Sequence, residues 1–204
     1  WDAFVETQPN ATLGHAAAWS RILRTAYGLD THYWVARAPS AADGTAGELR
    51  GVLPLVRFKR PFGSPHWISL PFLDSAGVLA VDEEAESALI EAALDQARQD
   101  GSADLELRNS APVSGYTPAQ DLDRVNLIMD LAEDEETQWT TLRAKVRNQT
   151  RKATKEGLEL MEGSNAELLS GFFAPFEVNM RDLGSPVHSR RFFETAQAEF
   201  GDRL

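Results

Sequence analysis

One pattern occurs twice in this chain, near its start and at its end, and it restricts the folds available to it. "HAAAWSRILRTAYG" begins at His15, and "HSRRFFETAQAEFG" begins at His188. The matching positions are His15 and His188, Trp19 and Phe192, Tyr27 and Phe200, and Gly28 and Gly201. This spacing predicts two amphipathic helices that each end at a glycine. Their similarity predicts a duplicated structural unit.

In the first copy the strand-like run "HYWVARA" follows at once, whereas in the second copy the sequence ends where that strand would begin. We therefore expect one complete unit and the opening helices of a second, truncated one. Further strands are expected at 49–59, 65–72, 76–81, 103–108 and 124–131, and helices at 83–101, 133–157, 165–180 and 189–200. Pro54 predicts an edge strand or a bulge. The fold class is α+β, with a central mixed sheet flanked by helices.

Charge and composition exclude several classes of function. The chain has 31 acidic residues against 20 lysines and arginines, and its formal net charge of -11 disfavours general binding to nucleic acids. Cysteine is absent, so disulfides, thiolate metal sites and cysteine nucleophiles are excluded. The four histidines lack metal-binding spacing, and we expect no metal site. No apolar run approaches the roughly 20 residues of a membrane span. We expect a cytoplasmic protein.

The cations gather in one passage, "AKVRNQTRKATKEG", at residues 144–157. On the expected helix, Arg147, Arg151 and Lys155 form one row, flanked by Lys145 and Lys152. A solvated helix face is the common explanation of such a run. The absence of acids before Glu156 favours instead a site for phosphate or another anion. On the opposite side an apolar stripe is expected, formed by Trp139, Leu142, Val146 and Ala153.

Three passages resemble a known family. "RNQTRKATKEGLEL" resembles the segment that joins the two halves of FemAB-type peptidyltransferases, which are built of tandem GNAT-like domains. "GVLPLVRFKRPFGSPHWISLPFLDSAGVLA" and "NMRDLGSPVHSRRFFE" resemble the FemAB-like proteins of exosortase/PEP-CTERM and exopolysaccharide systems. The resemblance covers nearly the whole chain. It implies an N-acyltransferase that acts on a cell-envelope or exopolysaccharide precursor.

The resemblance also implies site residues. "PFLDSAGV" is similar to the family's stretch with an acceptor-site aspartate, which is Asp74 here. "NMRDLG" is similar to the stretch with a precursor-binding arginine, which is Arg181 here. The family's tyrosine after it is replaced by Phe192 or Phe193, a departure that disfavours a peptidoglycan nucleotide as the acceptor.

Each candidate residue has a structural alternative. Asp74 either orients and deprotonates an acceptor or closes a turn with its own backbone. Arg181 either binds a phosphate or carboxylate through its planar fork or pairs with Asp182. His188 is either a base or part of the cap of the next helix.

Arg108 ends a predicted strand and either aims a cation into a cleft or pairs with Asp104 or Glu106. His66 flanks a strand without a recognisable partner. The aromatic residues Trp34, Trp67, Phe72 and Trp139 are expected in the core.

The resulting interpretation divides the chain into a first GNAT-like domain at 1–132, a basic connecting helix at 133–157 and the start of a second GNAT-like domain at 158–204. The implied donor is acyl-CoA or aminoacyl-tRNA, with no tightly bound cofactor. The implied acceptor is a small molecule or a nucleotide- or lipid-linked saccharide, and tRNA is a further partner through the missing half. Lys145, Arg147, Arg151 and Lys152 would bind phosphates. Residues 1–204 alone are expected to be inactive, and the sequence leaves the oligomeric state open.

A non-catalytic module that binds a saccharide or an assembly partner is the alternative, because no complete catalytic set is visible. Both interpretations place the ligand in a cleft beside the basic helix.

Overall fold

A mixed five-stranded sheet is the centre of the structure, a computed structural model that describes residues 1–204 except 41, 60–61, 103, 118–126, 164 and 202–204. The strand order is β1-β2-β3-β5, with β4 also beside β2, and all pairs are antiparallel except β3 with β5. The strands are β1 (Asp30–Arg37), β2 (Leu49–Phe58), β3 (His66–Ile68), β4 (Leu79–Ala80) and β5 (Leu105–Glu106). The helices are α1 (Asp2–Val5), the short 3₁₀ helix η1 (Leu13–His15), α2 (Ala18–Tyr27), α3 (Glu83–Gln99), α4 (Glu135–Thr141), α5 (Ala144–Lys155), α6 (Ala166–Asp182) and α7 (Arg190–Phe200). The expected α+β class with a mixed sheet is confirmed.

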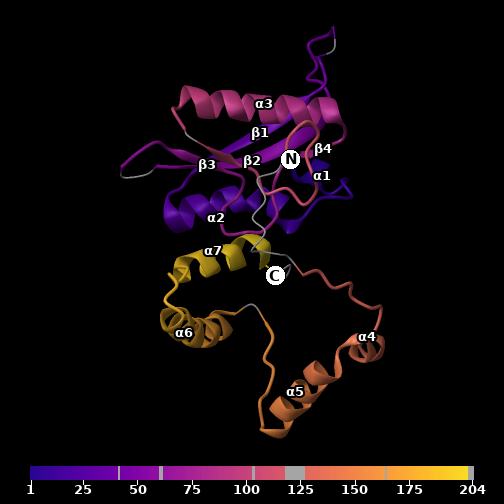
Figure 1. Ribbon diagram of the computed structural model, residues 1–204, viewed down its shortest axis with the longest axis vertical. Helices are drawn as coiled ribbons and strands as arrows, with labels where there is room; N and C mark the ends of the chain where they lie inside the picture. Colours follow the sequence, from indigo (N-terminus) through magenta and orange to yellow (C-terminus); the bar gives the residue numbers. More distant parts are fainter. Residues whose placement is uncertain (41, 60–61, 103, 118–126, 164, 202–204) are drawn as a thin grey trace.

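The sheet is covered on both faces. Helix α3 lies on one face and α2 on the other, and α7 lies against α2 on the side away from the sheet (Figure 1). Leu53 and Leu55 pack under α3, whereas Val56 joins the cluster of α2 and α7. Because both faces of β2 are buried, its sequence is a continuous apolar run rather than an alternating one.

Pro54 does not mark an edge strand, because β2 has neighbours on both sides. On the edge of β2 that faces away from β1, Gly51 and Val52 pair with β4, whereas Val56 pairs with β3. Pro54 lies between the residues that pair with β4 and those that pair with β3. Its missing N–H therefore removes no hydrogen bond to either of these two strands.

The two repeated helices pack against each other. The Trp19 and Phe192 rings stack at 6.1 Å between centroids, and reciprocal contacts join Trp19 to Phe200 and Tyr27 to Phe192, at 5.3 and 5.6 Å. Both glycine stops are confirmed, since the backbone at Gly28 and Gly201 has φ of 65° and 55°. The repeated aromatic positions therefore form the interface between α2 and α7.

The expected single helix over 133–157 is wrong: the structure has two helices, α4 and α5, separated by extended backbone at Leu142 and Arg143. The Arg147 guanidinium donates to the carbonyl oxygens of Leu142 and Thr140, at 2.5 and 3.1 Å. A side chain thus replaces the backbone amides that would have continued the helix.

The strand expected at 124–131 is also wrong for its described part, 127–131, which has no regular structure. Residues 124–126 lie outside the described residues. Leu127 and Ile128 are 93% and 91% exposed. An apolar run becomes a strand only beside a partner strand, and the described residues provide none here.

Candidate functional site

The loop between β3 and β4 carries Asp74 and has unusual backbone geometry. Leu70 and Phe72 have positive φ, 38° and 73°, although neither is glycine. Such conformations cost of order 1–3 kcal/mol each and persist only where the surroundings enforce them. Leu70 is fully buried, whereas Phe72 is 43% exposed, so the expectation of a core position for Phe72 is wrong. The fold thus holds a strained loop whose aromatic side chain reaches the surface.

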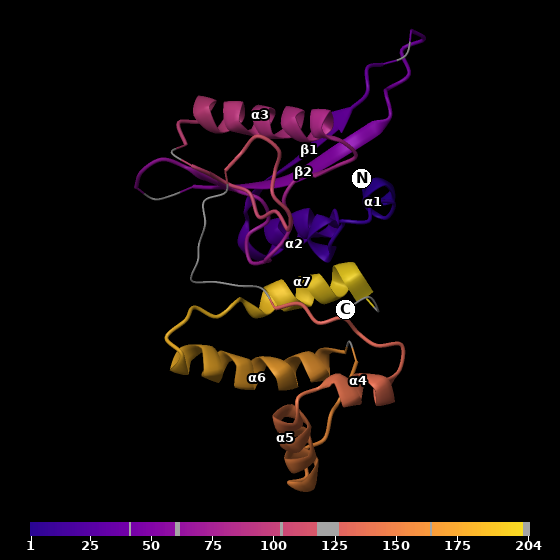
Figure 2. The same cartoon turned by 45° about the vertical axis from the view of Figure 1, so that its right-hand side comes forward.

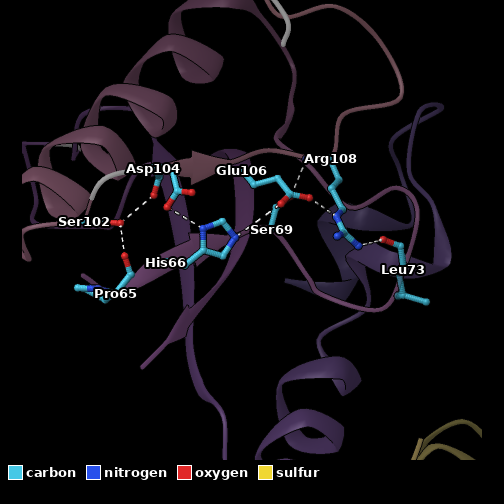
Figure 3. A network of polar contacts seen from close by, with 8 residues as sticks. All are labelled: Pro65, His66, Ser69, Leu73, Ser102, Asp104, Glu106 and Arg108. Carbon is cyan, nitrogen blue, oxygen red and sulfur yellow. Dashed lines mark hydrogen bonds and ion pairs between the residues drawn. The ribbon is translucent and has the colours of Figure 1, made fainter. Parts of the chain in front are cut away.

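Arg108 holds this loop to the sheet (Figure 3). Its guanidinium donates to the carbonyl oxygen of Leu73 at 2.8 Å and to Oε1 of Glu106 at 2.7 Å. Its backbone N–H donates to Oγ of the buried Ser69 at 2.7 Å. Of the two alternatives for Arg108, the structure shows pairing with Glu106, and it adds a contact that fixes the loop of Asp74.

His66 extends the same network, and the expectation that it lacks a partner is wrong. Its Nδ1 lies 2.8 Å from Oδ1 of Asp104, and its Nε2 lies 3.6 Å from Oε2 of Glu106 (Figure 3). Glu106 therefore lies between His66 and Arg108. Across the described residues, no group of three or more histidine and carboxylate side chains is arranged to hold a metal ion.

Replacing Arg108 by Met is expected to loosen the loop, because methionine keeps the aliphatic stem and loses both hydrogen bonds of the guanidinium. Backbone amides at 69–76 should exchange with solvent deuterium about tenfold faster or more, since a hydrogen bond to a charged group contributes about 1.5–3 kcal/mol. Hydrogen-exchange mass spectrometry measures this directly. Arg98→Met, which removes only an exposed pair with Asp95 on α3, is the matched control. Equal exchange in the two variants would show that Arg108 does not hold the loop.

The segment that follows α6 packs onto this loop through His188. The His188 ring lies edge-on to Phe72 at 4.8 Å and stacks on Phe192 at 5.0 Å. Its Nδ1 lies 2.8 Å from the hydroxyl of Tyr27, at the end of α2. Removal of the ring from water lowers the pKa of His188 below its usual value, which favours the neutral ring. The cap of α7 is Ser189, whose hydroxyl accepts from the Phe192 amide, and not His188.

Arg181 lies at the end of α6 and lines a hollow of about 480 Å³ with Glu177, Val178, Ser185 and Val187. Its contact with Asp182 is long, 3.4 Å, and both side chains are largely exposed, so this pair contributes little. Val187, which lines this hollow, is the residue directly before His188 in the sequence. The structure thus connects the Arg181 segment to the Asp74 loop, with His188 and Phe72 as the contact.

The Asp74 side chain is exposed, and no hydrogen bond or ion pair joins it to another described residue. A turn aspartate would accept from its own nearby backbone amides. The structure shows no such bond, so the Asp74 carboxylate is available to a ligand at the surface of the loop.

The basic helix is not part of this arrangement. Helix α5 lies far from the sheet, below α6 in both views (Figures 1 and 2), and none of its described residues is buried. Arg151 lies over the Trp139 ring at 5.3 Å, and Lys152 reaches Glu156 at 3.6 Å. Arg147 caps α4, and Lys145 is exposed. The structure therefore does not bring these cations to Asp74 or Arg181, contrary to the expected common cleft.

A larger hollow, of about 1000 Å³, lies between α6, α7 and residues 161–163. Its lining is mainly apolar, with Leu168, Phe172 and Phe193, and it also includes Glu162 and Glu167. Neither Asp74, Arg181 nor His188 lines this hollow, so it is a poorer candidate than the Asp74 loop.

Sequence reasoning missed Tyr27 as a site residue and assigned Phe72 to the core. Tyr27 was visible only as a repeated aromatic position at the end of a helix. Its hydroxyl contacts a residue 161 positions away, and no pattern of local spacing encodes such a pair.

Comparisons with known proteins support the fold. No family model and no curated protein matches the sequence. Five solved chains match it, among them the crystal structure of FemX, with a TM-score of 0.56 and 17% sequence identity. The match covers 99% of this chain and 53% of the FemX chain, so the chain spans about half the length of that protein. The match shows that this chain has the same fold as that part of FemX. Of the helices that the structure describes, none is both long and apolar enough to cross a membrane.

Proposed function

We propose that residues 1–204 are the acceptor-binding part of a FemAB-like N-acyltransferase, in which a second GNAT-like domain begins near residue 158. The observation that carries this proposal is the contact between the Asp74 loop and the segment after Arg181, through Phe72 and His188 at 4.8 Å. These are the two passages with the most specific resemblance to the family. The FemX-like fold is the second support.

In the proposed reaction, an amine or hydroxyl of the acceptor attacks the acyl carbonyl carbon of acyl-CoA or aminoacyl-tRNA. Asp74 orients the attacking group and accepts its proton as the new bond forms. The bond from the acyl carbon to the sulfur of CoA or to the ribose oxygen of tRNA breaks, and the leaving sulfur or oxygen takes up the proton that Asp74 accepted. Arg181 holds a phosphate or carboxylate of the acceptor in the neighbouring hollow. Catalysis of this kind depends mainly on positioning, which the Arg108 network supplies to the loop.

The acceptor that we propose is a cell-envelope or exopolysaccharide precursor, carried by a nucleotide or a lipid, and modified in the cytoplasm. The exosortase/PEP-CTERM resemblance of "NMRDLGSPVHS" motivates this branch. Where the family has a tyrosine, this chain has Phe192, buried between α2 and α7, and Phe193. Neither can donate a hydrogen bond to a ligand, which favours a saccharide other than a peptidoglycan nucleotide.

A thermal-shift screen of the full-length protein tests the proposal. UDP-N-acetylglucosamine serves as the nucleotide-linked saccharide, and acetyl-CoA and charged tRNA serve as donors. Stabilisation by the saccharide and by one donor, followed by transfer of a labelled acyl group, is the expected result. Stabilisation by the saccharide without transfer from any donor would favour the non-catalytic saccharide-binding module. Absence of any shift would contradict both.

Substitution of Arg147 and Arg151 by Glu tests whether the ligand binds at the Asp74 loop alone or in a cleft that also includes the basic helix. Exposed charges farther apart than about 10 Å are largely screened at 0.1 M salt, so the Kd for UDP-N-acetylglucosamine should change by less than about twofold. Isothermal titration at two salt concentrations measures this. If the variant binds more weakly and the difference from the wild type decreases as salt is added, the basic helix is part of the binding site.

A further inference from the structure

The hydrogen bonds around His188 determine which of its ring nitrogens carries the proton. The Tyr27 hydroxyl has two polar neighbours among the described residues: Nδ1 of His188 at 2.8 Å and the backbone amide of Ser189 at 3.4 Å. The amide can only donate, so the tyrosine oxygen accepts from it. Among the described residues, the acceptor within reach of the tyrosine proton is then Nδ1 of His188. A neutral imidazole whose Nδ1 accepts carries its proton on Nε2.

The other repeated histidine, His15, has the same arrangement but a different environment. The backbone N–H of Thr12 donates to Nδ1 of His15 at 3.0 Å, which again leaves the proton on Nε2. That Nε2 is buried without a hydrogen-bond partner, and His15 is only 3% exposed. At the matching position, Nε2 of His188 forms no hydrogen bond with the described residues, and the His188 side chain is only partly buried. Of the two histidines at matching positions of the repeat, His15 is therefore buried and His188 is only partly buried.

We infer that His188 presents a protonated Nε2 as a hydrogen-bond donor to a ligand oxygen beside the Asp74 loop, in the tautomer that Tyr27 fixes. His188 is then a ligand-contacting donor and not the base that its residue type suggests, and Tyr27 is a positioning residue. Proton removal is left to Asp74.

The ligand oxygen is one of an acceptor saccharide or its phosphate. His188 lies next in sequence to Val187, which lines the Arg181 hollow, and in contact with Phe72 of the Asp74 loop. A donor at this place complements Arg181, because both offer N–H groups to an anionic or carbonyl oxygen. This assignment of the ligand rests on the proposed function, whereas the tautomer rests on the hydrogen bonds of a neutral ring.

The first experiment reads the tautomer without any ligand. In the full-length protein labelled with ¹⁵N at histidine, long-range ¹⁵N–¹H correlation at pH 7.5 should show an unprotonated Nδ1 and a protonated Nε2 for His188, assigned by loss of its signals in His188→Gln. Tyr27→Phe removes the proton donor and should give a mixture of tautomers at His188, with His15 unchanged. A proton on Nδ1 in the wild type, or a charged ring, would overturn the inference.

The second experiment tests the contact with ligand. Glutamine reaches about as far as Nε2 and supplies an N–H there, whereas asparagine reaches only as far as Nδ1. His188→Gln should therefore keep the wild-type Kd for UDP-N-acetylglucosamine, and His188→Asn and His188→Ala should weaken it about three- to tenfold, the effect of one hydrogen bond. Equal weakening by all three would refute the donor role. If the wild type does not bind this saccharide, the proposed acceptor class fails, and the tautomer measurement alone decides the state of His188.

Discussion

Replacement of Asp74 by Asn should lower the rate of acyl transfer by the full-length protein about 10²- to 10⁴-fold, the usual contribution of a general acid or base. Asparagine keeps the size and one oxygen of the side chain but cannot accept the proton of the attacking group. The affinity for the acceptor should change little, because Arg181 and His188 supply its other contacts. Single-turnover rates with the donor found by the thermal-shift screen, together with the acceptor Kd, separate the two effects.

Asp95→Asn is the matched control, since Asp95 is also an exposed aspartate but lies on α3 and pairs with Arg98. It should transfer at the wild-type rate. If Asp74→Asn retains more than about a tenth of the wild-type rate, Asp74 contributes no more than positioning. If both the rate and the acceptor affinity collapse, the substitution has disturbed the strained loop itself.

Local spacing was sufficient to predict most of the elements. The glycine stops at Gly28 and Gly201, the buried face of α3 at Leu89, Ala93 and Ala97, and the long strand β2 all follow from periods of 3.6 or 2 and from the glycine conformation. Each of these features depends on residues within a few positions of one another.

The failures concern contacts that local spacing does not encode. The break between α4 and α5 depends on where the Arg147 side chain donates, which a helical wheel does not show. Residues 127–131 have a strand-like composition but no partner strand among the described residues. His66 finds Asp104 and Glu106 only because β3 and β5 are parallel neighbours.

The candidate site was predicted in its parts and not in its assembly. The resemblance implied Asp74 and Arg181, and the residue type and position of His188 made it a candidate, but no local pattern indicated that Phe72 would join their segments. The basic helix was added because its charge pattern was unusual. In the structure, Arg147 bonds to the end of α4 and Arg151 lies over the Trp139 ring. A count of charges cannot distinguish such contacts from a ligand site.

The repeat leads to the prediction with the largest effect on stability. Phe192→Ala should lower the free energy of unfolding by about 3–5 kcal/mol, the usual cost of removing a buried phenylalanine. The ring is 8% exposed and contacts Trp19, Tyr27 and His188, from both copies of the repeat. Its loss opens a cavity between α2 and α7 and also removes the surface on which His188 stacks. Urea unfolding followed by tryptophan fluorescence measures the change, because Trp19 lies in that cavity.

Phe62→Ala is the control, since Phe62 is 94% exposed and its loss should change stability by less than about 0.5 kcal/mol. The double variant Trp19→Ala, Phe192→Ala gives the sharper test. If the repeated rings stabilise one shared interface, the two single losses should exceed the double loss by about 0.5–1.5 kcal/mol, the coupling of an aromatic pair. Strict additivity would mean that α7 is held by its other contacts. The segment with His188 would then reach the Asp74 loop without the help of the repeated helices.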